Sequence, residues 1–319
     1  MTLNELISFG TTKLSKTSDS ATLDSEVLLA YVLKKPKEYL SANPKQFLLS
    51  NKLSKYKRLI DQRAKGWPVA YLTGHKEFFG LDFILDKNVL IPRPETESLV
   101  ELVLEKIKDK KTKIKILDIG TGSGNIIVAL AKVLSFVFAS GAKQSHSRVE
   151  IASSLRSSQR QLFFASDIST ASLRVARQNA KRHKVKINFK TGDLLKPWKN
   201  QSFDIIVANL PYLARKTDPS TKFEPKTALV AKNQGLALYE ELFKSIARSE
   251  ATRQSFIRSP RDLRSLAMVK NTLPAFVFVE IGHNQATQIK SLAKKCLPGF
   301  QVTFFKDLSD RVRYCQLQK

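Results

Sequence analysis

The chain has 319 residues, and its 42% of hydrophobic residues excludes disorder along its whole length. It carries 54 Lys and Arg against 28 Asp and Glu, and the net charge of +26 favours polyanionic or acidic partners through long-range attraction. The two cysteines and four histidines have no metal-ligand spacing, and no run approaches the roughly 18 apolar residues of a membrane span, so we expect no disulfide framework, no metal site and no membrane contact.

The first 74 residues have a helical pattern. Apolar residues recur at helical spacing in three segments, residues 3–14, 24–33 and 48–63. We interpret residues 1–74 as a small helical domain that docks a substrate, with a purely structural appendage as the alternative. The N-terminal residues are amphipathic and lack the apolar core of a signal peptide, so we expect a cytoplasmic protein.

Residues 75–97 are rich in aromatic and β-branched residues, with turn signals at Gly80 and around Asn88. This texture predicts a β-hairpin that links two domains. The segment ends in Ile91-Pro-Arg-Pro-Glu-Thr-Glu97, where the prolines favour an extended backbone and Thr96 with the neighbouring acids can open a helix. A proline-rich linker without further function would explain this sequence as well.

From residue 98 to residue 319, strand-like and helix-like segments alternate. The strand-like segments are residues 114–117, 161–166, 186–190, 205–208, 275–281, 301–306 and 312–317. This order predicts an α/β domain with a doubly wound, Rossmann-like sheet of seven strands, helices on both faces and an antiparallel edge. Two Ser- and Arg-rich stretches near residues 135–160 and 249–272 predict surface insertions. Their arginines could contact RNA, although solvated loops explain them too.

A glycine-rich turn follows the first of these strands, in the sequence Gly120-Thr-Gly122-Ser-Gly124. Glycines at alternate positions let the backbone pass close to a ligand where a helix begins. The spacing departs from the GxGxxG pattern of NAD sites, and Asp118 stands just before the turn. The pattern therefore favours a methionine-bearing nucleoside, whose cationic groups need carboxylates and carbonyls. A tight turn without a ligand is the alternative.

Polar residues also follow the second and third strands. Asp167 ends the second strand, where a carboxylate can accept both hydroxyls of a ribose. Asp193 follows the third strand and could lie near an adenine amine, or merely form a turn.

The fourth strand ends in Asn209-Leu-Pro-Tyr212. The Asn209 amide oxygen, a backbone carbonyl turned outward by Pro211 and the face of Tyr212 suit a planar NH₂ group, either of a base or of a carboxamide. An ordinary strand-to-loop turn would also explain these residues.

With these motifs, the chain resembles the release-factor glutamine methyltransferase family. The resemblance is carried by the Ile91–Glu97 junction, the Asp118–Gly124 turn, Asn209–Tyr212, Phe223-Glu-Pro225 and Thr227-Ala-Leu229. It implies methyl transfer from S-adenosyl-L-methionine to the side-chain amide nitrogen of the glutamine in the Gly-Gly-Gln motif of class 1 peptide-chain release factors. We therefore expect a helical substrate-docking domain over residues 1–74, a β-hairpin linker over 75–97 and an S-adenosylmethionine-binding methyltransferase domain over 98–319.

The resemblance also implies roles for single residues. The implied cofactor-binding residues are Gly120, Thr121, Gly122, Ser123 and Gly124 at the methionine part, Asp167 at the ribose, Leu194 beside adenine, and Asn209. The implied substrate-binding residues are Asn209, Leu210, Pro211 and Tyr212, of which Asn209, Pro211 and Tyr212 are the expected catalytic residues.

Two positions depart from the family pattern. Leu210 stands where the family usually has proline, and Leu194 stands where an aromatic residue sometimes flanks adenine. Since Asn-Leu-Pro-Tyr also occurs in ribosomal-RNA adenine dimethyltransferases, an RNA or DNA amino-methyltransferase acting on adenine N6 is the alternative function. A binding module that kept the fold without activity is a third hypothesis. We expect a monomer, with at most weak RNA contact through its basic surface.

Overall fold

The computed structural model describes residues 1–108, 114–140, 162–199, 201–215, 221–256 and 273–319. The chain divides into two units. The first, called here the helical unit, comprises Met1–Lys76, Leu85–Lys87 and Thr217–Glu224; the second, called the sheet unit, comprises Glu77–Ile84, Asn88–Lys216 and Pro225–Lys319. The domain limits expected from the sequence, at residues 74 and 97, stay a prediction.

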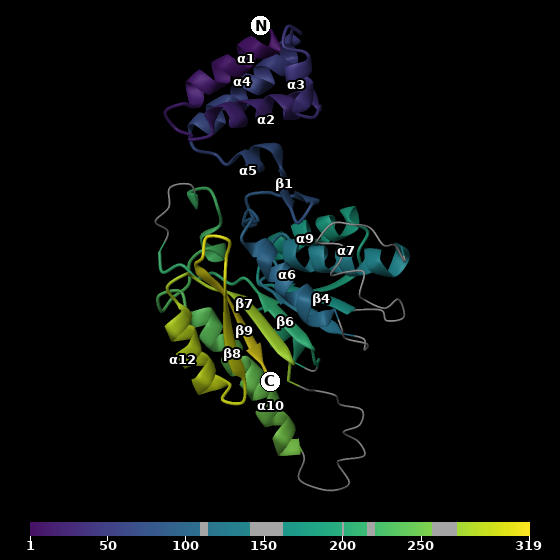
Figure 1. Ribbon diagram of the computed structural model, residues 1–319, viewed down its shortest axis with the longest axis vertical. Helices are drawn as coiled ribbons and strands as arrows, with labels where there is room; N and C mark the ends of the chain where they lie inside the picture. The colour runs from purple at the N-terminus through teal and green to yellow at the C-terminus, as the bar shows by residue number, and fades with distance from the viewer. Residues whose placement is uncertain (109–113, 141–161, 200, 216–220, 257–272) are drawn as a thin grey trace. The chain divides into compact units, whose positions relative to one another are not determined.

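The helical unit contains three longer helices that pack on one another, α1 (Leu3–Leu14), α2 (Ala21–Leu33) and α4 (Ser50–Ala64). They correspond to the three segments with helical periodicity (Figure 1). Two five-residue helices, α3 (Glu38–Ala42) and α5 (Val69–Thr73), were not predicted, because one turn of helix is too short to show a repeating apolar pattern.

A polar contact lies within the apolar core of the helical unit. The hydroxyl of Tyr56 donates to the carbonyl of Leu6 at 2.9 Å and lies 2.7 Å from the hydroxyl of Ser25. Both side chains are fully buried, so these hydrogen bonds satisfy groups that water cannot reach. Gly10 packs directly against this pair: a Cβ atom added there would lie 2.3 Å from the Tyr56 oxygen.

The hairpin predicted for residues 75–97 forms over a shorter range. Strands β1 (His75–Phe78) and β2 (Leu81–Ile84) pair as a two-stranded sheet, and the turn residues Phe79 and Gly80 both have positive φ. Two positive φ angles are what a type I′ turn requires. The side chain of Asn179 then holds the end of the hairpin, since it accepts from the Ile84 N–H at 2.8 Å and donates to the Ile84 carbonyl at 3.0 Å.

The sheet unit contains seven strands in the order β5-β4-β3-β6-β7-β9-β8. Their bounds are β3 (Lys115–Ile119), β4 (Leu162–Asp167), β5 (Ile187–Thr191), β6 (Ile205–Ala208), β7 (Phe276–Glu280), β8 (Gln301–Lys306) and β9 (Val312–Gln318). The first five strands in this order are parallel, and β9 is antiparallel to both of its neighbours. The predicted Rossmann-like sheet with an antiparallel edge is confirmed.

Helices cover both faces of this sheet, as predicted (Figure 1). On one face lie α6 (Thr96–Ile107), α7 (Asn125–Ser140) and α9 (Thr170–Arg182); on the other lie α10 (Ala237–Phe256) and α12 (Ala286–Cys296). Helices α7 and α10 extend into the stretches where insertions were expected, and most of the remainder of those stretches lies outside the described residues.

The strand order creates a switch point between β3 and β6. After β3 the chain moves to one side, toward β4, and after β6 it moves to the other side, toward β7. In open α/β sheets, ligands bind at the carboxyl ends of the strands where the direction of winding changes. The glycine-rich turn follows β3, and Asn209 follows β6, so the fold places both motifs at this point.

We expect Gly10→Ala to destabilise the helical unit by about 1–2 kcal/mol. Alanine normally favours a helix by about 1 kcal/mol, but forcing extra atoms into a filled core costs about 1–3 kcal/mol, and here the neighbours are two hydrogen-bonded hydroxyls. Amide hydrogen exchange of α1 and α2 in the full chain measures the effect. Thr12→Ala, at an exposed position of the same helix, is the control and should slow exchange slightly; slower exchange in Gly10→Ala as well would contradict the packing argument.

Candidate active site

A pocket of about 330 Å³ lies at the carboxyl ends of the parallel strands. The residues after β3, β4, β5 and β6 all contribute to its wall. The segment before α6 and the segment around the 3-10 helix Lys226–Ala228 complete it. The lining includes Gly120–Ser123, Asp167–Ser169, Gly192–Leu194, Asn209–Pro211, Asn88–Leu90, Pro92, Arg93, Thr96, Thr227, Ala228 and Val230. All of these residues belong to the sheet unit.

The glycine-rich turn combines two kinds of position. Gly120, Thr121, Gly122 and Ser123 line the pocket, whereas Gly124 does not. Gly124 has a φ of 81°, and an added Cβ atom would lie 3.2 Å from the Cβ atom of Ala176 in α9. The absence of a side chain at Gly124 therefore serves the packing of the turn against α9.

Asp118 lies beneath this turn and is not part of the pocket wall. Its carboxylate accepts from the hydroxyl of Thr121 at 2.6 Å, and burial raises its pKa to about 7. The sequence suggested a carboxylate that meets the ligand directly. In the structure, Asp118 instead supports Thr121, which itself lines the pocket.

The carboxylate of Asp167 is held by two backbone groups. One oxygen accepts from the Gly122 N–H at 2.9 Å and the other from the Ser169 N–H at 2.8 Å. Each carboxylate oxygen has two lone-pair directions, so both retain capacity for a further donor in the pocket. Burial raises the pKa of Asp167 above its ordinary value.

Apolar side chains complete this part of the pocket. Leu194 lines it with a positive φ of 47° and is buried. Ile168, which follows Asp167, also lines the pocket and is 70% exposed. Sequence patterns did not indicate Ile168, because a single apolar residue after a strand is not distinctive. Asp193 lines the pocket as well and forms an ion pair with Lys196 at 2.6 Å.

The side-chain amide of Asn209 has a defined orientation. Its Nδ2 donates to Glu280 Oε2 at 3.0 Å and to Thr96 Oγ1 at 3.2 Å. The Thr96 hydroxyl in turn donates to Glu280 Oε2 at 2.7 Å. With Nδ2 engaged, Oδ1 is the amide atom left to accept a hydrogen bond from a ligand. Thr96 was expected to open a helix; it is the first residue of α6, but its hydroxyl serves Glu280 rather than a helix cap.

The three residues after Asn209 differ in whether they line the pocket. Leu210 and Pro211 line the pocket, and the Leu210 carbonyl lies 3.1 Å from the buried hydroxyl of Tyr239. Tyr212 is not part of the pocket wall. Its hydroxyl donates to Glu280 Oε1 at 3.4 Å, and burial, followed by the negative charge of Glu280, raises the pKa of Tyr212.

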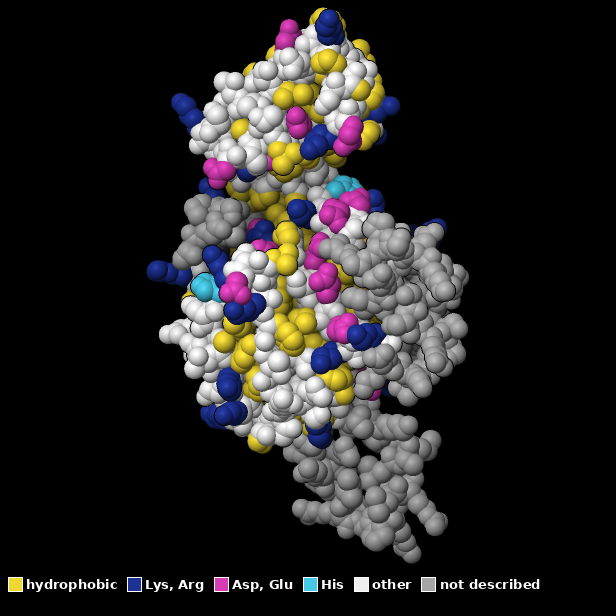
Figure 2. Space-filling model, in the orientation of Figure 1, with side chains coloured by type: hydrophobic (Ala, Val, Ile, Leu, Met, Phe, Trp, Pro, Cys, Tyr) yellow, Lys and Arg dark blue, Asp and Glu magenta, His cyan; other side chains and the backbone are white. Residues whose placement is uncertain are grey.

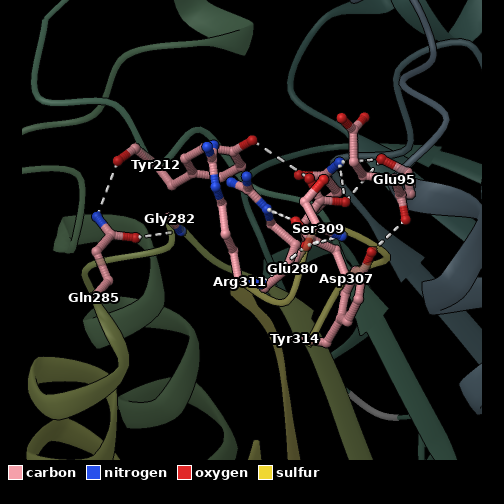
Figure 3. Close-up of polar contacts among 12 residues, drawn as sticks. Glu95, Tyr212, Glu280, Gly282, Gln285, Asp307, Ser309, Arg311 and Tyr314 are labelled. Carbon is pink, nitrogen blue, oxygen red and sulfur yellow. Dashed lines mark hydrogen bonds and ion pairs between the residues drawn. The ribbon is translucent and has the colours of Figure 1, made fainter. Parts of the chain in front are cut away.

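Glu280 is a second residue beside the pocket that sequence patterns did not indicate. It is the last residue of β7, is 1% exposed and accepts hydrogen bonds from Thr96 and Asn209. It also accepts one from Tyr212, which is labelled with it in Figure 3. Burial raises its pKa to about 7, although its hydrogen-bond donors oppose that shift. A signal existed: one acid ends the apolar run Phe-Val-Phe-Val-Glu280, just as Asp167 ends β4.

Gln285 supports the same loop from below. Its Nε2 donates to the Tyr212 carbonyl at 2.9 Å and the Gln234 carbonyl at 3.0 Å, while its Oε1 accepts from the Gly282 N–H at 2.8 Å (Figure 3). Gly235 passes so close that an added Cβ atom would lie 1.9 Å from the Tyr212 oxygen. The loop after β6 is therefore held by β7, α10 and the segment before α12.

Comparisons with known proteins identify the family. A model of the PrmC N-terminal domain matches residues 5–74, and a methyltransferase-domain model matches residues 110–272. The release factor glutamine methyltransferase of Dictyoglomus turgidum is 36% identical over 233 residues, which cover 70% of this chain and 73% of that protein. The corresponding protein of Bacillus anthracis is 30% identical over 304 residues, or 92% of both chains. This chain belongs to the release factor glutamine methyltransferase family.

Likeness to solved structures is weaker. The protein-(glutamine-N5) methyltransferase of Alicyclobacillus acidocaldarius is 22% identical, with a TM-score of 0.36, and the match covers 74% of this chain and 99% of that one. Among the residues that the structure describes, none of the helices combines the length and the apolar character needed to cross a bilayer.

The cofactor of this family of methyltransferases is S-adenosylmethionine, and the pocket residues fit it. Asp167 offers carboxylate oxygens to hydroxyl groups, and Leu194 and Ile168 offer apolar surface to a planar base. At Gly122 an added Cβ atom would meet nothing within 4 Å, so the turn leaves open space for a ligand beside its backbone. When bound, the cofactor supplies an electrophilic methyl group.

We expect Gly235→Ala to loosen the loop after β6. The left-handed φ of 86° costs about 1–2 kcal/mol with a side chain, and the clash with the Tyr212 carbonyl adds about 1–3 kcal/mol. Faster amide exchange at Leu213 and Ala231, which pair across this loop, measures the loss. Gly80→Ala is the control, because its φ is 72° but its Cβ atom would meet nothing within 4 Å. If Gly80→Ala speeds exchange at the β1–β2 turn as much as Gly235→Ala speeds it in the loop after β6, the contact with Tyr212 is unimportant.

Proposed function

We propose that this chain transfers the methyl group of S-adenosylmethionine to the side-chain amide nitrogen of a glutamine, the one in the Gly-Gly-Gln motif of class 1 release factors. The observation that carries this proposal is the fixed amide of Asn209, whose Nδ2 is held by Glu280 and Thr96 so that Oδ1 is left for a ligand. The names of the relatives in this family support a glutamine of a release factor as the substrate.

Asn209 would act by binding and orienting the substrate amide. An amide nitrogen is a weak nucleophile because its lone pair is shared with its carbonyl group. A hydrogen bond from the substrate NH₂ to Asn209 Oδ1 holds the nitrogen in position and stabilises the positive charge that develops on it during transfer. The Leu210 carbonyl keeps a second lone pair beside its contact with Tyr239 and can accept the other N–H.

The remaining pocket residues would hold the cofactor and shape the site. Asp167 would bind the ribose hydroxyls, Leu194 and Ile168 would contact adenine, and the backbone of Gly120–Ser123 would bind the methionine part. Gly124, which packs on α9, and Tyr212, which packs beside Glu280, act indirectly. No general base is required, because the substrate nitrogen becomes acidic after transfer and its proton can pass to water.

The helical unit would dock the release factor. Its two most exposed large apolar side chains are Phe47 at 73% and Leu49 at 69%, which together offer a small contact surface. In a binding assay with the full chain, the double substitution Phe47→Ser and Leu49→Ser should weaken release-factor binding and leave cofactor affinity unchanged.

We also propose that the protein is a monomer and acts in the cytoplasm, where release factors are found.

Nucleic acid is the alternative acceptor, and the charge of +26 is the observation that favours it. On the described part of the face in Figure 2, Lys and Arg side chains are spread out and interspersed with Asp and Glu, and they form no continuous basic track there. Incubation with methyl-labelled cofactor and either release factor or ribosomal RNA tests the substrate. Label on the glutamine supports the proposal, and label on RNA alone overturns it.

Two substitutions separate the proposed roles. Asn209→Ala should lower kcat by at least about 100-fold, since it removes an acceptor that acts on the developing charge, and should leave cofactor affinity within a few-fold. Asp167→Asn should weaken cofactor binding by about 10- to 100-fold, because it loses charge-assisted hydrogen bonds. Calorimetric titration and a single-turnover methylation assay give both quantities. A nearly normal rate in Asn209→Ala would exclude its assigned role.

A further inference from the structure

Glu280 connects three separate parts of the sheet unit. It lies at the end of β7 and accepts from Thr96 at the start of α6 and from Asn209 and Tyr212 after β6. Glu280 does not line the pocket, so its influence on a ligand must pass through the residues it holds. Of these, Asn209 lies in the pocket wall and has an amide whose two ends are opposite in hydrogen-bonding character.

The ionisation of Glu280 decides which end of that amide faces inward. A carboxylate only accepts hydrogen bonds, so it can bind the Asn209 NH₂ group but not the Asn209 oxygen. A protonated Glu280 carboxyl group can donate to Asn209 Oδ1. It would thereby stabilise the Asn209 amide rotated by about 180°, with Oδ1 and Nδ2 exchanged. That rotated amide would present NH₂ to the substrate NH₂, and two donors cannot bind each other.

We propose that Glu280 is a positioning residue whose carboxylate keeps the Asn209 amide oxygen directed at the substrate. This inference rests on the proposed function, in which Asn209 Oδ1 accepts from the glutamine amide. It adds that the enzyme is competent only while Glu280 is ionised. Thr96 contributes a second donor to the same carboxylate oxygen, at 2.7 Å, and so stabilises the ionised form.

Charged and titratable groups surround Glu280 on every element packed against it. They are Glu95 beside α6, Tyr212 after β6, Tyr239 on α10, and Arg313 and Tyr314 on β9, with Asp307 paired to Arg313 at 3.4 Å. Arg313 favours the carboxylate and Glu95 opposes it, while burial has the largest effect and raises the pKa of Glu280 to about 7. The carboxylate population therefore increases as the pH rises through 7.

The pH profile of methylation tests this inference. In the wild-type chain, the single-turnover rate constant for methylation of release factor should rise about tenfold per pH unit below the pKa of Glu280 and level off above it. Glu280→Gln keeps the shape and one acceptor oxygen but does not titrate, so this acidic limb should disappear. Thr96→Val removes a donor that favours the carboxylate and should move the limb to higher pH. Glu241→Gln, at a glutamate on α10 that pairs with Arg248, is the control and should keep the wild-type profile.

Removing the Glu280 side chain tests whether it positions Asn209 or only stabilises the fold. Glu280→Ala leaves the Asn209 amide without its anchor, and we expect kcat at pH 8 to fall about 10- to 100-fold, the loss of a hydrogen bond to a charged group, while cofactor affinity stays within a few-fold. If Glu280→Ala fails to fold, the profile of Glu280→Gln decides. An acidic limb that is unchanged in Glu280→Gln overturns the inference. If the wild-type chain does not methylate release factor at any pH, the proposed function fails instead.

Discussion

The site depends on a buried carboxylate that three segments of the chain share. A carboxylate in an apolar interior is costly unless donors surround it, and Glu280 receives donors from α6 and from the loop after β6. Because each donor must reach the same oxygen atoms, the arrangement constrains all three segments together. Misplacing any one of them would leave a buried polar group unsatisfied. The geometry of Asn209 is therefore coupled to the packing of the whole sheet unit.

The same principle appears at the other end of the pocket, with a different outcome. Asp167 also ends an apolar strand, but it is held by backbone N–H groups and lines the pocket, whereas Glu280 is covered by side chains of its own protein. In the proposed function the two acids have different roles. Asp167 offers its remaining lone pairs to the cofactor, and Glu280 uses its lone pairs to orient the Asn209 amide.

The supporting residues show why the loop after β6 tolerates leucine in place of proline at position 210. The Tyr239 hydroxyl, which has a single proton, lies 2.5 Å from the carbonyl of Glu280 and 3.1 Å from that of Leu210, and Gln285 donates to the carbonyl of Tyr212. Gly235 packs against that last carbonyl as well. Main-chain contacts of this kind do not depend on the side chain at position 210, so the loop is held in place without the rigidity of a second proline.

The amino-acid sequence by itself determined the features that contiguous residues encode. Periodicity located the three longer helices and the strands, and short motifs located Gly120–Ser123, Asp167, Leu194 and Asn209, all of which line one pocket. Tertiary structure alone decided how Asn209 is oriented. Its partners Glu280 and Thr96 are 71 and 113 residues away in the chain, and no local pattern records that they meet. Local sequence likewise did not show which motif residues line the pocket: Asp118 is buried and accepts from Thr121, the Tyr212 hydroxyl donates to Glu280, and neither residue is part of the pocket wall.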